Sequence, residues 1–179
     1  MGLGTAMINR NMRILAGLGA LGLSFALLPI AEAHADRGTV SLSGYSQGTI
    51  VIKTRERRLY YMVGDDRALR YPVGVGRPDK QWAGRSIISG KYIKPAWSPP
   101  EEIRRDNPRL PDVIPGGAAN NPMGAAAMTL VGGEYAIHGT NRPGSVGGFV
   151  SYGCIRMLNS DILDLFNRVG VGTPVVVEP

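Results

Sequence analysis

The sequence predicts a mostly β protein, a sandwich or barrel with one helix near its C-terminal end and a long proline-rich loop. Short runs of β-branched and aromatic residues recur along the chain, as is typical of strands. Only one segment has a helical period. Residues 94–127 have no clear period and are rich in proline. We therefore expect strands to supply most of the hydrophobic core.

Residues 1–35 are predicted to be a secretory signal peptide. Two arginines precede an apolar run at 14–30, and the small-residue pattern "AEAHA" follows it. The run is shorter than the ~20 residues of a spanning helix, and Pro29 interrupts it. We expect cleavage after Ala33 or Ala35. The mature protein should then reside in the periplasm or be secreted, without a stable membrane anchor.

The size and charge of the mature chain limit its number of domains and the kind of partner it can bind. Cleavage after Ala35 leaves 144 residues, which suits a single domain with a real core. These residues include 18 basic and 13 acidic side chains, so the surface suits an anionic partner such as a cell-wall polymer or a lipid head group. The basic residues are scattered and do not alternate with aromatic residues. Nucleic acid is therefore not expected as a partner.

The first half of the mature chain is predicted to form strands. Residues 36–48 are rich in glycine and serine, and we interpret them as an N-terminal linker that has room for one short strand. The runs "TIVIKT" (49–54), "RRLYYMVG" (57–64) and "ALRYPVGVG" (68–76) are typical of strands. The intervening "DDR" (65–67) predicts a turn.

Residues 94–127 contain the proline-rich loop. The segment has no clear period, and loops longer than ~12–15 residues in compact domains are usually functional or disordered. We interpret it as a lid or groove wall. It contains apolar residues that we expect to pack: Trp97, Ile103, Leu110, Val113 and Ile114.

A tight hairpin is predicted after this loop. The runs "AMTLV" (127–131) and "EYAIH" (134–138) flank Gly132 and Gly133, which can supply the two positive φ angles of a type I′ turn. His138 then ends the second strand. Strict alternation places Ala136 and His138 on the same face of that strand.

The helix is predicted between Asn159 and Gly170. Its apolar residues recur at three- and four-residue steps, namely Ile162, Leu163, Leu165, Phe166 and Val169. Asn159 or Ser160 suits the N-cap, and Gly170 suits the stop. The run "TPVVVE" (173–178) then predicts a closing strand.

Cys154 is the only cysteine, and signal cleavage would leave His138 as the only histidine. Secreted proteins usually pair their cysteines, so a single one suggests chemistry; the alternative is a small buried apolar residue. A histidine within reach can take the thiol proton and return it to a leaving amine. One cysteine and one histidine leave a tetrahedral zinc two ligands short, so no metal is expected.

Three neighbours of Cys154 are candidates for binding. Gly153 allows close backbone approach, and the N–H groups of Gly153 and Cys154 are candidate oxyanion donors. If residues 154–156 are extended, Arg156 shares a face with the cysteine. It would then favour the thiolate or hold a substrate carboxylate; the alternative is a structural ion pair.

These residues resemble the L,D-transpeptidase family with the YkuD-type catalytic domain. That family has a His-Gly segment followed by Ser-x-Gly-Cys-Ile/Val-Arg, and here the segments read "HGTN" (138–141) and "SYGCIRM" (151–157). The upstream "NNPMG" (120–124) resembles the family's Asn-Pro-hydrophobic-Gly element. The resemblance begins at about Thr49, which makes 49–179 the catalytic domain.

The resemblance implies a β-rich enzyme that acts on peptidoglycan stem peptides through a thioester, without a cofactor. Cys154 would be the nucleophile and His138 the general base and acid, oriented by the Gly139 carbonyl. Ser151 would support the cysteine turn, and Tyr152 stands where many members carry His or Ser. Together with Arg156 and Gly153, these two residues are the candidate substrate and oxyanion residues.

The acyl acceptor stays open at this point. Another stem peptide would give a cross-link, and an envelope protein's amine would give a protein attached to the wall. Water as acceptor would make the protein an L,D-carboxypeptidase or hydrolase. A catalytically inactive wall-binding domain is the alternative from a different class.

Overall fold

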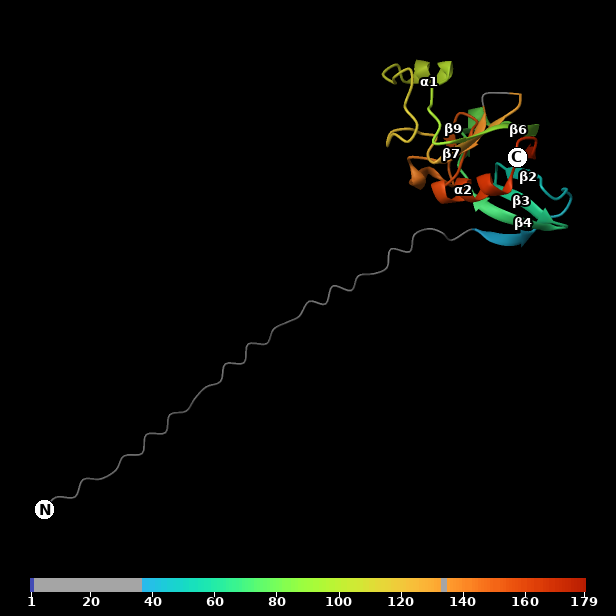
Figure 1. The fold of residues 1–179 in the computed structure, drawn as a ribbon, viewed down its shortest axis with the longest axis horizontal. Helices are drawn as coiled ribbons and strands as arrows, with labels where there is room; N and C mark the ends of the chain where they lie inside the picture. Colours follow the sequence, from blue (N-terminus) through green and yellow to red (C-terminus); the bar gives the residue numbers. More distant parts are fainter. Residues whose placement is uncertain (2–36, 133–134) are drawn as a thin grey trace. The chain divides into compact units, whose positions relative to one another are not determined.

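The computed structural model describes residue 1 and residues 37–132 and 135–179. Apart from Met1, the predicted signal peptide lies outside the described residues. No helix in the described part of the chain has the length and apolar character needed to cross a membrane. Figure 1 shows the strands of the folded region with α2 beside them and α1 at the far end of a long loop.

Most of the described elements are strands, which confirms the predicted fold class. The strands are β1 (Gly38–Ser41), β2 (Ile50–Lys53), β3 (Arg58–Gly64), β4 (Arg67–Pro72), β5 (Val75–Gly76), β6 (Gly84–Ile93), β7 (Ala126–Leu130), β8 (Ala136–His138), β9 (Phe149–Ser151), β10 (Ile155–Arg156) and β11 (Pro174–Glu178). The helices are α1 (Glu101–Asp106) and α2 (Asn159–Arg168), with short 3-10 turns η1 (Pro78–Lys80) and η2 (Pro143–Ser145).

Nine strands form one mixed sheet in the order β1-β4-β3-β2-β11-β6-β7-β8-β10. The long strand β6 joins its two halves, because residues 84–87 pair with β11 and residues 88–93 pair with β7. Apolar side chains from both halves then meet in one core, which includes Ile50, Ile52, Leu59, Val175, Ile88, Met128, Ile137 and Ile155. β5 and β9 form a separate parallel pair beside this sheet.

The strands expected from the sequence are present. The run at 68–76 divides into β4 and β5 after Pro72, whose ring nitrogen has no proton to donate to a ladder. The hairpin of β7 and β8 is antiparallel, and the Leu130 N–H donates to the Tyr135 carbonyl at 3.0 Å. Residues 133 and 134 lie outside the described part, so the type I′ turn stays a prediction.

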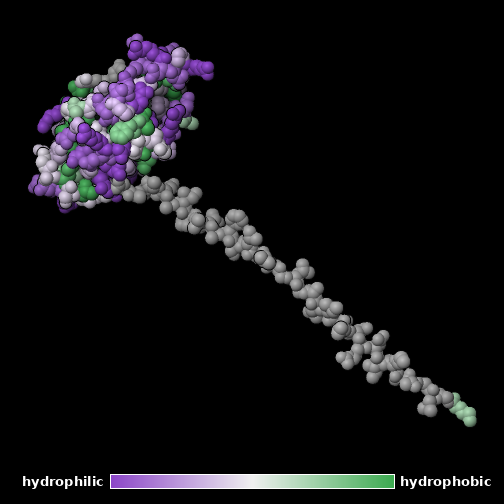
Figure 2. Space-filling model, turned by 180° about the vertical axis from the view of Figure 1, so that it is seen from behind, coloured by the Kyte–Doolittle hydropathy of each residue, from purple (hydrophilic) through white to green (hydrophobic). Residues whose placement is uncertain are grey.

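Residues 38–48, which we expected as a linker with room for one strand, pack on the sheet. β1 pairs with β4, and Tyr45 donates a hydrogen bond to Glu178 at 2.8 Å. Val40, Leu42 and Tyr45 cover a second apolar cluster on the other face of the sheet, formed by Val51, Tyr60, Met62 and Ala68. Figure 2 shows a mostly hydrophilic surface in which hydrophobic residues form only small groups.

The helix α2 follows the cysteine as predicted and buries Ile162 and Leu165 in the core. Its N-cap differs from the expectation, because Leu158 occupies that position and makes no side-chain cap. Asn159 is instead the first helical residue, and its amide contacts two loops. The helix also holds the fully buried Tyr71, whose hydroxyl donates to Asp164 at 2.6 Å.

The proline-rich loop contains a second helix, α1, which the sequence did not predict. Six residues are too few to display a period, but the acids of its first turn and the arginines of its last turn match the helix dipole. At the base of the loop, Trp97 and Ile114 exchange two backbone hydrogen bonds of 2.9 and 2.8 Å. Ile114 is buried as expected, whereas the expectation that Val113 packs is wrong, since it is 52% exposed.

Candidate active site

The site forms where β8 and β10 run side by side. The two strands are parallel, with Ile155 opposite Ile137 and Arg156 opposite His138. Register partners project from the same face of a sheet, so Arg156 and His138 are neighbours. Cys154 immediately precedes β10 and is partly exposed. The fold therefore sets Arg156 beside His138, and Cys154, two residues before Arg156, is close enough to influence its charge.

His138 is buried, with 4% of its surface exposed. Its Nδ1 lies 2.7 Å from the Gly139 carbonyl oxygen. A carbonyl only accepts hydrogen bonds, so Nδ1 must carry the proton and Nε2 must present its lone pair in the neutral ring. The Gly139 carbonyl thus stands where the sequence expected it, and the tautomer it selects is the one that can act as a base at Nε2.

Burial keeps this imidazole neutral. Desolvation first, and then the positive charge of Arg156, lower the pKa of His138 to about 4, while the Gly139 and Pro122 backbone carbonyls, which favour the charged ring, oppose the shift. At neutral pH the ring is therefore uncharged, as a general base must be.

Asn159 fixes the segment that follows His138. Its Oδ1 accepts from the N–H groups of Ala125 and Thr140 at 3.0 and 2.9 Å, and its Nδ2 donates to the Thr140 carbonyl at 2.9 Å. A Cβ at position 139 would lie 2.3 Å from the same Oδ1, so only glycine fits there. One amide therefore holds α2, β7 and the backbone that orients the imidazole.

The cysteine turn is closed by Ser151. Its hydroxyl donates to the Cys154 carbonyl at 2.6 Å and accepts from the Gly153 N–H at 3.1 Å. The Gly153 amide is thus already engaged, and an oxyanion would compete with Ser151 for it. Gly153 has φ 117°, and a Cβ there would meet the Tyr135 ring at 2.3 Å. Only glycine allows this turn.

The aromatic side chains of Trp82 and Tyr135 pack against Gly153. Trp82 stacks on Tyr135 with ring centroids 5.0 Å apart, and its Nε1 donates to the Gly153 carbonyl at 2.9 Å. Stacked rings of this kind are rigid and well packed. The Gly153 backbone beside Cys154 is therefore held through both its N–H and its carbonyl.

Arg156 has no carboxylate partner among the described residues. Its Nη1 donates to Ser145 Oγ at 2.9 Å, and its buried Nε has no hydrogen-bond partner there. Burial and the charge of Arg142 lower the pKa of Arg156, and the charge of Cys154 opposes this shift. The ion pair that was the alternative for Arg156 is therefore not formed by the described residues, and the guanidinium can receive an anion.

The hydroxyl of Tyr152 contacts α1 and not Cys154 or His138. That hydroxyl donates to the Asp106 carboxylate of α1, and the Arg77 guanidinium lies over the Tyr152 ring, 4.0 Å from its centroid. The hydrogen bond to Asp106 is the main cause of a raised Tyr152 pKa. The side chain thus connects the cysteine turn with the proline-rich loop.

Among the residues of the site that the sequence did not identify are Asn159, Arg142, Trp82 and Asp106. Asn159 was noticed only as a cap, and the other three lie far along the chain or in loops without a period. Among residues 37–132 and 135–179, no three His, Cys, Asp or Glu side chains gather as metal ligands. Residues of the site that could hold an anion are Arg156 and Arg142.

Comparison with known proteins gives one consistent family. Residues 47–177 match the model of the L,D-transpeptidase catalytic domain, YkuD. The probable L,D-transpeptidase YbiS of Escherichia coli is 40% identical over 135 residues, which cover 70% of this chain and 43% of the relative. The chain thus spans less than half the length of that relative.

Solved structures share the fold. An L,D-transpeptidase from Mycobacterium smegmatis superposes with a TM-score of 0.59 at 19% identity, covering 73% of this chain and 58% of the other. A Brucella melitensis protein named as a probable carnitine operon oxidoreductase superposes with a TM-score of 0.55 at 36% identity, covering 80% and 93%. The fold therefore occurs in proteins that are named for different activities.

Replacing Asn159 tests whether its amide positions the histidine. Asn159→Ala removes three hydrogen bonds, two of them to the backbone of the buried Thr140, so we expect a loss of about 1–3 kcal/mol in the free energy of unfolding. Thiol reactivity at Cys154 should fall as well, because the Gly139 carbonyl is no longer held. Urea unfolding and the rate of reaction with iodoacetamide measure the two effects. The neighbouring Ser160→Ala is the control, and equal behaviour of both variants would contradict the assignment.

The buried imidazole predicts a pH-dependent stability. In the unfolded chain the histidine titrates near its ordinary pKa of 6.5, but in the fold it resists protonation down to about 4. The contribution of the neutral His138 to the free energy of unfolding is therefore fully present above pH 6.5. It declines as the pH falls towards 4, by roughly 3 kcal/mol in total. Denaturant unfolding at pH 7, 5.5 and 4.5 should show a steeper decline for the wild type than for His138→Gln. Parallel curves would contradict the prediction.

Proposed function

The chain belongs to the L,D-transpeptidase family, and we propose that its mature form is a periplasmic or secreted cysteine transpeptidase of peptidoglycan stem peptides. The observation that carries this proposal is the strand pair β8–β10. His138 ends β8 and Cys154 immediately precedes β10, and the Nδ1 of the buried His138 lies against a carbonyl, which leaves Nε2 as an acceptor; this arrangement supports the proposal. This pair suits acyl transfer through a thioester.

The first half of the reaction is acylation. Nε2 of His138 takes the thiol proton, and the sulfur of Cys154 attacks the carbonyl of the third residue of a stem tetrapeptide. The amide bond to the fourth, D-configured residue breaks, and its nitrogen takes the proton back from the imidazolium. The products are a thioester on Cys154 and a free D-amino acid. A neutral imidazole at rest is the state from which this cycle can begin.

The second half is transfer. An acceptor amine gives a proton to His138 and attacks the thioester carbonyl. The carbon–sulfur bond breaks, and the imidazolium returns the proton to the sulfur, which restores the thiol and the neutral imidazole. The free energy of the cleaved amide is conserved in the thioester, so the new amide forms without a nucleotide. A stem peptide as acceptor gives a cross-link, and an envelope protein's amine gives a protein bound to the wall. Water as acceptor would give hydrolysis.

Arg156 is proposed to hold the free carboxylate of the leaving residue. It is the register partner of His138, so a guanidinium and a proton donor stand side by side. In an amino acid, the carboxylate and the amine are attached to the same carbon, which matches this juxtaposition. The buried Nε without a partner and the neighbouring Arg142 both favour an anion here.

Acylation by a carbapenem tests the nucleophile. One structurally similar LD transpeptidase, LdtMt1, is known in complex with imipenem. We expect intact-mass spectrometry of the mature wild type to show one imipenem adduct, and we expect none on Cys154→Ala, whose circular dichroism and melting should match the wild type. A wild type without an adduct, or an equal adduct on the variant, would sink the proposal. Defined muropeptides, with products identified by mass, then separate dimer formation from hydrolysis.

Changing Arg156 tests the carboxylate site. Arg156→Gln removes a charge-assisted contact, so KM for a stem tetrapeptide should rise by roughly 10- to 100-fold. The preference of the wild type for a free C-terminal carboxylate over its amide should disappear in the variant. Arg67→Gln, on the distant strand β4, is the matched control and should leave both quantities unchanged. An undiminished preference for the free acid in Arg156→Gln would refute the role.

A further inference from the structure

We propose that Tyr152, Arg77 and Asp106 anchor the tip of the proline-rich loop beside the cysteine turn, so that the loop forms a fixed wall of the cleft that receives the donor peptide. Tyr152 is then a positioning residue for the donor. This inference rests on the proposed function and adds to it the means by which the stem peptide is held. The segment concerned, residues 98–113 with α1 at its tip, is called the α1 segment.

The base of the α1 segment is firmly attached to the domain. Trp97 and Ile114 form an antiparallel bridge, and the buried Asn121 donates through Nδ2 to the Pro95 and Pro115 carbonyls, each at 2.9 Å. Asn121 also accepts from the Met123 N–H at 2.9 Å. This explains the asparagine of the "NNPMG" element. Both ends of the segment are therefore tied to one point.

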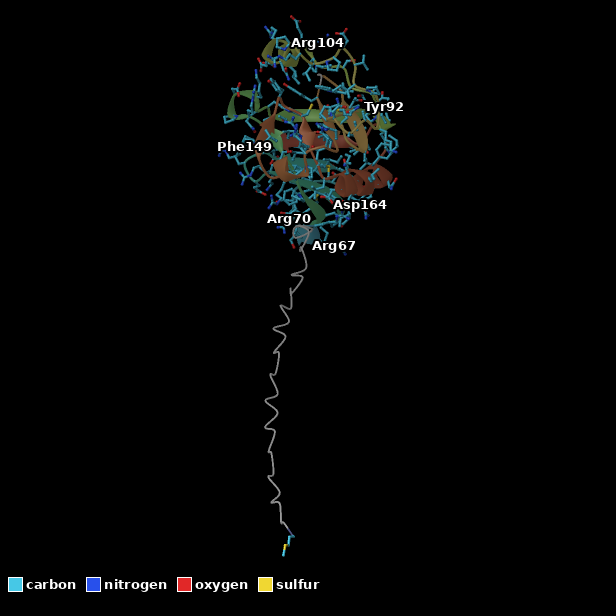
Figure 3. The ribbon with its side chains drawn as sticks, turned by 90° about the vertical axis from the view of Figure 1, so that its left-hand side faces the viewer. Arg67, Arg70, Tyr92, Arg104, Phe149 and Asp164 are labelled. Carbon is cyan, nitrogen blue, oxygen red and sulfur yellow. The ribbon has the colours of Figure 1, made fainter. Side chains whose placement is uncertain are left out.

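The tip lacks an apolar attachment. α1 contains no buried residue. Figure 3 shows Arg104 of α1 at the end of the domain opposite Arg67 and Arg70 of β4. A short helix without a buried face is not held by the hydrophobic effect. Its position must depend on polar contacts.

Two groups of polar contacts attach α1 to the domain. Asp106 receives the hydrogen bond from Tyr152 and lies 3.9 Å from Arg77 Nη2. One turn earlier, Glu102 pairs with Lys80 of η1. Arg77 immediately precedes η1 and Lys80 is its last residue, so α1 and η1 face each other through complementary charges. An ion pair that also contacts an aromatic ring, as Arg77 does, stabilises a structure more than an isolated surface ion pair does.

The partners of α1 are continuous with the nucleophile. Tyr152 is two residues before Cys154, and the Arg77 N–H donates to the Ser151 carbonyl at 2.9 Å. Ser151 in turn closes the cysteine turn. Any displacement of Asp106 relative to Tyr152 therefore changes the distance between the α1 segment and the sulfur. Cys154 remains partly exposed while these contacts are formed, so the anchored segment borders the nucleophile and does not cover it.

The test separates donor binding from sulfur chemistry. Tyr152→Phe keeps the ring under Arg77 but removes the hydroxyl, and Asp106→Asn removes the acceptor charge. For each variant we expect KM for a stem tetrapeptide to rise roughly fivefold with kcat little changed, as for the loss of one charge-assisted hydrogen bond. The rate of imipenem acylation should stay within about twofold of the wild type, because a small acylator does not need the wall.

A double variant and a matched control complete the design. Tyr152→Phe with Asp106→Asn should raise KM no more than either change alone, because both break the same contact. Asp106→Glu should restore part of the affinity. Arg105→Gln, an exposed residue of the same helix, should have no effect.

Two results would overturn the proposals, one for each. A wild type that imipenem does not acylate would refute the proposed function. A wild type that is acylated and turns over donor, with KM unchanged in both Tyr152→Phe and Asp106→Asn, would refute the wall alone. Hydrogen exchange at residues 98–113 gives an independent readout, since the amides of α1 should exchange faster in both variants.

Discussion

The site depends on the parallel pairing of β8 and β10. Parallel strands cannot be joined by a tight turn, so the 15 residues between His138 and Cys154 must leave the sheet and return to it. The returning segment contains η2 and β9, and β9 pairs with β5 outside the main sheet. The spacing between the two residues is therefore the length of a crossover. The glycines within it allow that crossover to be compact.

Burial gives the histidine its chemistry and carries a cost. The pKa of His138 is lowered to about 4 because the ring is withdrawn from water and faces Arg156, and this keeps the ring neutral at neutral pH, with the lone pair of Nε2 free to accept a proton. The same arrangement leaves the Nε of Arg156 without a partner among the described residues. Two positive groups close together would repel each other, so the histidine stays neutral and the arginine carries the charge. An incoming anion relieves the arginine, which links substrate binding to the electrostatics of the base.

The strands and α2 could be predicted because each has a period that burial imposes. β2 is buried on both faces over its apolar run "IVI" (50–52), and α2 repeats its apolar residues at helical spacing. Cys154 and His138 could be singled out as candidates, since each is the only residue of its type in the predicted mature chain; their roles stay a proposal. α1 was not, because six exposed residues without a buried face leave no pattern. Arg142 and Asp106 reach the site through loops, whose paths no local period encodes.

Two asparagines explain how such loops become precise. Asn121 gathers both ends of the proline-rich loop, and Asn159 joins β7 to the segment after His138. Each amide both donates and accepts, so a single side chain can satisfy backbone groups of opposite polarity. Loops that leave a sheet need this, because their backbone groups have no ladder partner. Around the nucleophile, side-chain amides and hydroxyls thus supply the order that strand pairing supplies elsewhere. A mutation of these polar groups should therefore disturb function before it disturbs the hydrophobic core.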